Sequence, residues 1–218
     1  MSPVFDAVSG IDGASSWTHT CSGTNRFLYV VTDTTCTTVT YSGVPMTVVH
    51  SLAMTTGAAA IGVSPMQVWG LVAPATGANT VARSPNSSGS SISYTDHLQS
   101  LTPDAVTTNK SSTSATSLTT TIATVTDNCW LLFASFGYFF GVAQGVGAGL
   151  TFRRCKSGLG GPMISDSNGP KTPAGSHSGT TTMVGSAGEP IYHIVIAMAP
   201  AAPAPSGGGE KTSVSSFF

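Results

Sequence analysis

Short apolar runs separated by glycine and proline are the feature that most limits how this chain can fold. The 218 residues include 25 glycines and 13 prolines, and almost no segment has the i, i+3, i+4, i+7 apolar spacing of an amphipathic helix. β-rich runs of about four to eight residues instead alternate with Gly, Pro, Asn and Ser, which is typical of an all-β sandwich or barrel. Parallel strands would need helical crossovers, and none is predicted, so the sheets are expected to be antiparallel.

The β-rich runs predict about a dozen strands. Residues 26–32 (RFLYVVT) are almost continuously apolar, which predicts a core strand buried on both faces. Ser42 and Gly43 separate two runs and predict a tight hairpin turn. The Ser/Thr-rich stretch 102–117 is expected to be a long exposed loop. The expected strands cover residues 3–8 (a first strand or an arm), 17–21, 26–32, 37–41, 44–50, 66–72, 79–83, 90–98, 118–125, 129–136, 150–154, 180–184 and 191–199.

Two packed antiparallel sheets of the jelly-roll kind are the simplest architecture for these strands. We expect the jelly-roll sandwich to cover residues 15–199, preceded by an N-terminal arm or edge strand over residues 1–14. Residues 200–218 are rich in Pro and then in Gly, which is the composition of a tether. The tether ends in Phe217 and Phe218. These are candidate partner-docking residues, because exposed aromatic side chains at a chain end need a partner to be useful, and the alternative is a disordered tail.

Charged residues make up only 8% of the chain, against roughly 25% in an ordinary soluble domain. The polar surface must therefore consist of Ser, Thr, Asn and Gly, which suits an extracellular or virion-exposed protein. The net charge of −1 provides no basic field for phosphate groups, so nucleic-acid binding is not expected. A membrane span is not expected either, because Gly137 and Gly141 interrupt the most apolar stretch, residues 129–146. The N-terminus lacks the basic and apolar regions of a signal peptide.

Metal binding is not predicted. The cysteines are widely spaced and no histidine lies at ligand spacing, so zinc is not expected and four buried thiols are favoured, with a Cys21–Cys36 bridge as the alternative. Asp166, Ser167, Asn168 and Gly169 resemble the start of a calcium loop but lack the later acidic ligand, so an Asx turn is the simpler interpretation. The four cysteines are Cys21, Cys36, Cys129 and Cys155.

Catalytic and cofactor motifs are also missing, and we expect no enzyme, no catalytic residue and no cofactor. The sequence contains no HExxH, no Gly-x-Ser-x-Gly and no P-loop. Asp96 and Glu189 are carboxylates that could meet as a glycosidase pair, but nothing in the sequence requires it. His19 and His193 are interpreted as structural strand residues.

Tryptophans could form a platform for sugar rings. Trp130 lies within the most apolar strand and is assigned to the core. Trp69 is the candidate glycan contact, although core packing is favoured for it as well, because a tryptophan buries so much area.

Two sequence stretches resemble a known family. WTHTCSGTNRFLYVVTDTTCTTVTYSGVPMT (residues 17–47) with VWGLVAPATGANTV (residues 68–81) resembles a jelly-roll domain of tailed-bacteriophage and prophage structural proteins. Later stretches, ISDSNGP, AGSHSGTTT and YHIVIAMAP, are similar to the closing strands of the same domain, so the resemblance covers most of residues 15–200.

The resemblance implies a fold and a virion context rather than a reaction. We therefore expect a virion structural protein, above all a capsid decoration (cement) protein on the outer shell that bridges subunits of the major capsid protein or other virion proteins. Such a protein would be a homo-oligomer, with a trimer favoured because it suits local three-fold positions. The alternatives are a tail-fibre or baseplate component acting as an adhesin, and a carbohydrate-binding module.

Overall fold

The computed structural model describes residues 1–54, 65–113, 115–137, 144–155, 161–183 and 190–202. All regular secondary structure in these ranges is β, in fifteen strands that pair antiparallel throughout. The same ranges contain no helix long and apolar enough to cross a membrane. The strands of the first half are β1 (Val4–Cys21), β2 (Phe27–Thr32), β3 (Thr38–Tyr41), β4 (Val44–Pro45), β5 (Thr47–Ala53), β6 (Pro65–Val72) and β7 (Gly77–Thr95).

The strands of the second half are shorter and more even in length. They are β8 (Ala105–Lys110), β9 (Ser117–Ala123), β10 (Trp130–Gly137), β11 (Gln144–Val146), β12 (Thr151–Cys155), β13 (Gly161–Asp166), β14 (Ser176–Met183) and β15 (Tyr192–Met198).

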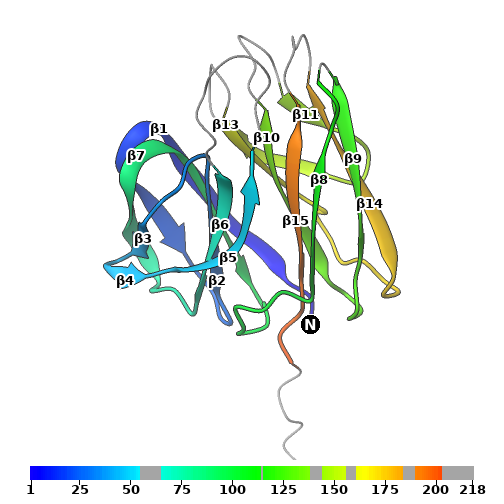
Figure 1. Cartoon of the computed structure of the whole chain (residues 1–218). Helices are drawn as coiled ribbons and strands as arrows, with labels where there is room; N and C mark the ends of the chain where they lie inside the picture. Colours follow the sequence, from blue (N-terminus) through cyan, green and yellow to red (C-terminus); the bar gives the residue numbers. More distant parts are fainter. Residues whose placement is uncertain (55–64, 114, 138–143, 156–160, 184–189, 203–218) are drawn as a thin grey trace, which may run out of the picture.

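Three sheets result from this pairing (Figure 1). The first has seven strands in the order β4-β3-β7-β2-β6-β5, with β1 paired to β7. The second has five strands, β12-β13-β10-β15-β8, and the third has three, β11-β14-β9. The first sheet curls on itself because β1 and β7 are long and bend together, with register shifts in β1 between Asp12 and Ser16.

The core consists of three apolar layers between four layers of strands. The even-numbered residues Leu28 and Val30 of β2 pack inside the curled first sheet, and the odd-numbered Tyr29 packs against the second sheet. In β10, Leu132 faces the first sheet, whereas Phe133 faces the third sheet. β2 and β10 are therefore buried on both faces, which confirms the expected core strand over residues 27–32, with Arg26 just outside it.

The same strand order occurs in both halves of the chain. Because β1 and β7 each bend, residues 4–12 and 16–21 of β1, and residues 77–84 and 88–95 of β7, act as separate strands. We number eight strands along each half in chain order. In the first half, strands 1 and 2 are the two parts of β1, strands 3 to 6 are β2, β3, β5 and β6, and strands 7 and 8 are the two parts of β7, with β4 left out as an addition. These strands pair in the orders 1-8-3-6-5 and 2-7-4. The second half, β8 to β15, has the same two orders. The two halves pack through their 1-8-3-6-5 sheets.

The structure agrees with the all-β, antiparallel expectation and corrects several element boundaries. Ser42 and Gly43 both have positive φ and join β3 to β4 in the predicted hairpin turn. The stretch 102–117 is not simply a loop, because it contains β8, which pairs with β15. β11 and β13 were not expected, and four expected strands are parts of β1 and β7. Residues 4–14, expected as an arm or an edge strand, lie in β1 against β7.

A close approach between the second and third sheets provides a first prediction. A Cβ atom on Gly179 of β14 would overlap the ring of Phe133, which is fully buried in β10. Gly179→Ala is therefore expected to lower the free energy of unfolding by about 1–3 kcal/mol, the usual cost of overpacking. Urea denaturation measures this loss. Ser176→Ala, on the exposed face of the same strand, is the control and should change stability by less than about 0.5 kcal/mol.

Candidate functional site

His19 is the centre of a polar cluster inside the first half. Its Nδ1 lies 2.8 Å from the Ser9 hydroxyl and 3.0 Å from the Ser91 hydroxyl, and its Nε2 lies 3.0 Å from the Ser93 hydroxyl. Burial lowers the pKa of His19 to about 4, although the nearby carboxylate of Asp6 acts in the opposite direction. The imidazole is therefore neutral at pH 7 and is held in place by hydroxyl groups.

The His19 cluster does not have the geometry of a catalytic triad. The Ser93 hydroxyl donates to Asp6 Oδ2 at 2.7 Å, so a serine separates the carboxylate from the imidazole. Asp6 also accepts a hydrogen bond from the Ser22 backbone N–H at 2.9 Å. A triad needs the carboxylate on the histidine itself and a nucleophile open to substrate. The buried arrangement instead satisfies polar groups within the core.

Two further buried histidines have the same character. The rings of His193 and His97 are almost fully buried, and burial lowers the pKa of each to about 4. His193 lies between the hydroxyls of Thr120 and Thr181, at 2.8 Å and 2.6 Å. His97 Nδ1 lies 2.5 Å from the carbonyl oxygen of the next residue, Leu98, and therefore donates to it. His97 Nε2 accepts from the Tyr29 hydroxyl at 2.9 Å.

A buried ion pair within the second half also contacts the first half. Asp166 of β13 is fully buried, and its Oδ2 accepts from Arg153 Nε at 2.8 Å and from the Tyr94 hydroxyl of β7 at 2.9 Å. The Arg153 guanidinium also lies 3.9 Å from the centre of the Phe5 ring in β1. Burial and the neighbouring carboxylate raise the pKa of Tyr94 well above its usual value, so that its hydroxyl remains a donor. Asp166 Oδ1 accepts from the Asn168 backbone N–H at 3.0 Å, which is the predicted Asx turn.

Most side chains that the sequence suggested for binding are buried. Trp69 is only 6% exposed and packs in the core of the curled sheet, so it presents no open ring face to a sugar, and the glycan-contact role considered for it does not fit this position. Trp130 is likewise in the core. Asp96 is partly buried beside His97, and its suggested partner Glu189 lies outside the described residues, as do Phe217 and Phe218.

The cysteines form no bridge in the structure. All four are free thiols; Cys155 is partly exposed and the other three are buried. Cys21 and Cys36 pack in the same apolar layer without bonding to each other. Burial raises the pKa of Cys129 to about 12, which makes that thiol a poor nucleophile. No three His, Cys, Asp or Glu side chains within the described ranges are grouped so that they could hold a metal ion.

The outer face of the third sheet is the first candidate interaction surface. β9 and β14 pair so that Thr119 lies opposite Thr180 and Thr121 opposite Ser178. The hydroxyls of these pairs are 2.8 Å and 2.7 Å apart. Figure 1 shows these two strands at one side of the stack of layers. The outward positions, which we call the C face, contain only small uncharged residues: Ser117, Thr119, Thr121, Ala123, Ser176, Ser178, Thr180 and Thr182.

The opposite side of the stack has an equivalent surface. It is formed by the strands that occupy positions 2, 7 and 4 of the first half, the same positions that β9, β14 and β11 occupy in the second. Its inward residues include Trp17, Val39 and Val81. Its outward residues, which we call the N face, again have no charged or aromatic side chain: Ser16, Thr18, Thr20, Thr38, Thr40, Ala78, Thr80, Ala82 and Ser84.

The two faces are what sequence reasoning missed. Alternating Thr and Ser residues are visible in SWTHT and in SLTTTIA, but only the layer order shows that both sets lie on the outermost sheets. The chain matches no family model, no curated protein and no solved structure. Its function is therefore argued from the chemistry of these faces and from the internal use of its ionisable groups.

Proposed function

We propose that this chain is a non-catalytic structural protein built from two jelly-roll-like halves. A jelly roll has eight strands in two sheets, and the repeated orders 1-8-3-6-5 and 2-7-4 differ from that pattern only in strand 5, which lies beside strand 6. The buried histidines and Asp166 support the non-catalytic part of the proposal, because each is engaged in contacts that hold the layers together.

Within this class, a capsid decoration protein of a tailed bacteriophage is the function we favour. A protein that braces a shell must contact two neighbouring subunits at once, and the observation that carries the proposal is the pair of equivalent N and C faces on opposite sides of the stack. Neither face has a charge that would have to be desolvated on contact. Many copies, each with two weak contacts, would stabilise a shell through avidity.

Charges placed on the faces test this proposal. Thr18→Lys with Thr80→Lys alters the N face, and Thr119→Lys with Thr121→Lys alters the C face. Each pair should weaken binding to undecorated capsids by at least about tenfold, because a lysine must be desolvated in an uncharged interface. Co-sedimentation with capsids measures the affinity. Thr35→Lys, in an exposed loop, is the matched control and should bind normally. Unchanged binding of both face variants would contradict the assignment of the faces.

The position on the particle distinguishes decoration from the tail-fibre or baseplate alternative. A reconstruction of particles from the phage or prophage that encodes the chain, together with quantitative mass spectrometry, gives location and copy number. Shell symmetry predicts hundreds of copies on the capsid surface, with trimers at local three-fold positions. A dozen or fewer copies, at the tail, would favour the adhesin.

A neutral-glycan-binding module is the second candidate, and the same hydroxyl-bearing faces favour it. Hydroxyl groups both donate and accept hydrogen bonds, as sugar hydroxyls do. With Trp69 buried, the contact surface would have to be the N or C face rather than an aromatic platform. Binding to neutral polysaccharides that the C-face lysine variant abolishes, without binding to capsids, would support the module over the decoration protein.

A further inference from the structure

Large apolar side chains are exposed at one end of the stack. Met1 is 72% exposed and Val125 77%, the two highest values for large hydrophobic side chains among the described residues. Leu98 and Leu101 are each 37% exposed. We call these four residues the end patch. Exposed apolar side chains that gather on one surface indicate a binding site more often than side chains scattered singly.

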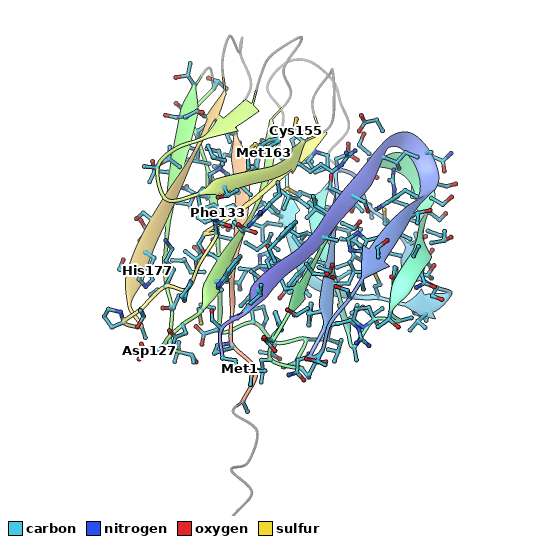
Figure 2. The ribbon with its side chains drawn as sticks, turned by 180° about the vertical axis from the view of Figure 1, so that it is seen from behind. Met1, Asp127, Phe133, Cys155, Met163 and His177 are labelled. Carbon is cyan, nitrogen blue, oxygen red and sulfur yellow. The ribbon has the colours of Figure 1, made fainter. Side chains whose placement is uncertain are left out.

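Hydrogen bonds bring the segments of the end patch together. The Ser2 hydroxyl donates to the carbonyl oxygen of Asn128 at 3.1 Å, which places the N-terminus beside the β9–β10 turn. The Asp104 carboxylate accepts from the backbone N–H groups of Val125 and Thr126 at 2.7 Å and 2.9 Å, which places that turn beside the segment after Leu101. Figure 2 shows Met1 and Asp127 at the same end of the molecule.

The last described residues also lie at this end of the stack. The Leu98 N–H donates to Ala199 O at 3.0 Å, and the Ala201 N–H donates to Asp96 O at 2.7 Å. The last described residues therefore run beside the segment that carries Leu98 and Leu101. Residues 203–218 thus begin at the edge of the end patch, and their large apolar side chains are Val214, Phe217 and Phe218.

We propose that Phe217 and Phe218 bind the end patch of their own chain. A random-coil chain with the length of residues 203–218 would have a root-mean-square span of about 20 Å, which is enough to reach back over the patch. Tethering raises the local concentration of the aromatic pair to about 1 mM, so even a contact with a dissociation constant of about 0.1 mM would be formed most of the time. A second copy of the chain would have to reach similar concentrations in solution to compete.

This contact does not depend on the function proposed above. If the chain is a decoration protein, however, the contact changes the role of its C-terminal residues. An aromatic pair held on its own body is covered until a partner offers a better site. A partner that takes up the pair must therefore displace it from Leu98, Leu101 and Val125, and would leave the end patch free for a second contact.

Hydrogen exchange followed by mass spectrometry tests the contact on the full-length chain. Replacing the aromatic pair (Phe217→Ser with Phe218→Ser) should speed exchange in residues 98–104 and 125–128 by roughly a factor of 5 to 10, because the tethered contact would otherwise cover these residues most of the time. The matched control, Ser215→Ala with Ser216→Ala, keeps the aromatic pair and should leave exchange unchanged. The same result is expected at 1 µM and at 100 µM protein, because an intramolecular contact does not depend on concentration.

Release of the terminal phenylalanines by carboxypeptidase A tests the same contact from the tail. Val125→Asp should speed release several-fold by weakening the patch, whereas Val44→Asp, the same change at an exposed valine of β4, should not. Unchanged exchange and unchanged release would overturn the proposal. Protection that appears only at 100 µM, together with dimers in size-exclusion chromatography, would overturn it in favour of contact between two copies.

Discussion

Lowering the pH from 7 to 5 is expected to remove about 6 kcal/mol from the free energy of unfolding of this protein, because three buried histidines resist protonation. His19, His97 and His193 have a pKa of about 4 in the fold, below the value of 6.5 for an exposed histidine. Between these two values the unfolded chain takes up protons that the folded chain does not. Stability is therefore complete above pH 6.5, falls as the pH drops toward 4, and changes little below that.

Each histidine contributes about 2 kcal/mol of this loss at pH 5 and about 3 kcal/mol at pH 4. Three such losses are comparable with the whole stability of a typical domain, so acid unfolding between pH 5 and pH 4 is expected. Urea denaturation followed by circular dichroism at pH 7, 6, 5 and 4 measures the loss.

Substitution identifies the histidines responsible. His193→Gln keeps a polar side chain between Thr120 and Thr181 and should make the fall with pH shallower by about one third. Thr18→Gln, at an exposed position of β1, adds no titratable group; it is the control and should leave the pH dependence as it is. A stability that stays constant from pH 7 to pH 4 would contradict the neutral, buried state of these rings.

Removing the buried carboxylate between the halves is the substitution with the largest expected effect. Asp166→Ala leaves the Arg153 guanidinium and the Tyr94 hydroxyl without their shared acceptor in a buried site. The loss should be about 3–5 kcal/mol, as for other buried pairs from which one partner is removed. It is measured as the change in the free energy of unfolding by chemical denaturation at pH 7.

An exposed ion pair and a double variant serve as comparisons. Asp12 lies 3.8 Å from Arg154 with both side chains partly exposed, so Asp12→Ala should cost less than about 1 kcal/mol. Asp166→Ala combined with Arg153→Leu should cost clearly less than the sum of the two single changes, because the second change removes the stranded charge. Strict additivity of the two would show that Asp166 and Arg153 do not act as a pair.

Both predictions concern buried polar groups that connect strands and layers. The Asp166 site holds the first half against the second, and His19 and His193 each link strands within one half. Charged residues make up only 8% of the chain, and two of those in the described residues, Arg83 and Asp166, are buried.

The sequence alone determined the local structure wherever backbone preference and burial act together. Alternation and turn residues were enough to predict an all-β, antiparallel fold, the double burial of residues 27–32 and the hairpin turn at Ser42 and Gly43. The Asx turn at Asp166 followed from the short-range hydrogen bonding of Asp and Asn. These features depend on neighbours within a few residues, so they can be read along the chain.

Only the tertiary structure decided which residues meet across long sequence separations. β8 has no fully buried residue and is placed by its pairing with β15, so its sequence resembled a loop. The bends of β1 and β7, the repeated strand order and the burial of Trp69 depend on contacts between residues tens of positions apart. For the same reason, the alternating Thr and Ser residues could be recognised as two equivalent outer faces only after the layers were in place.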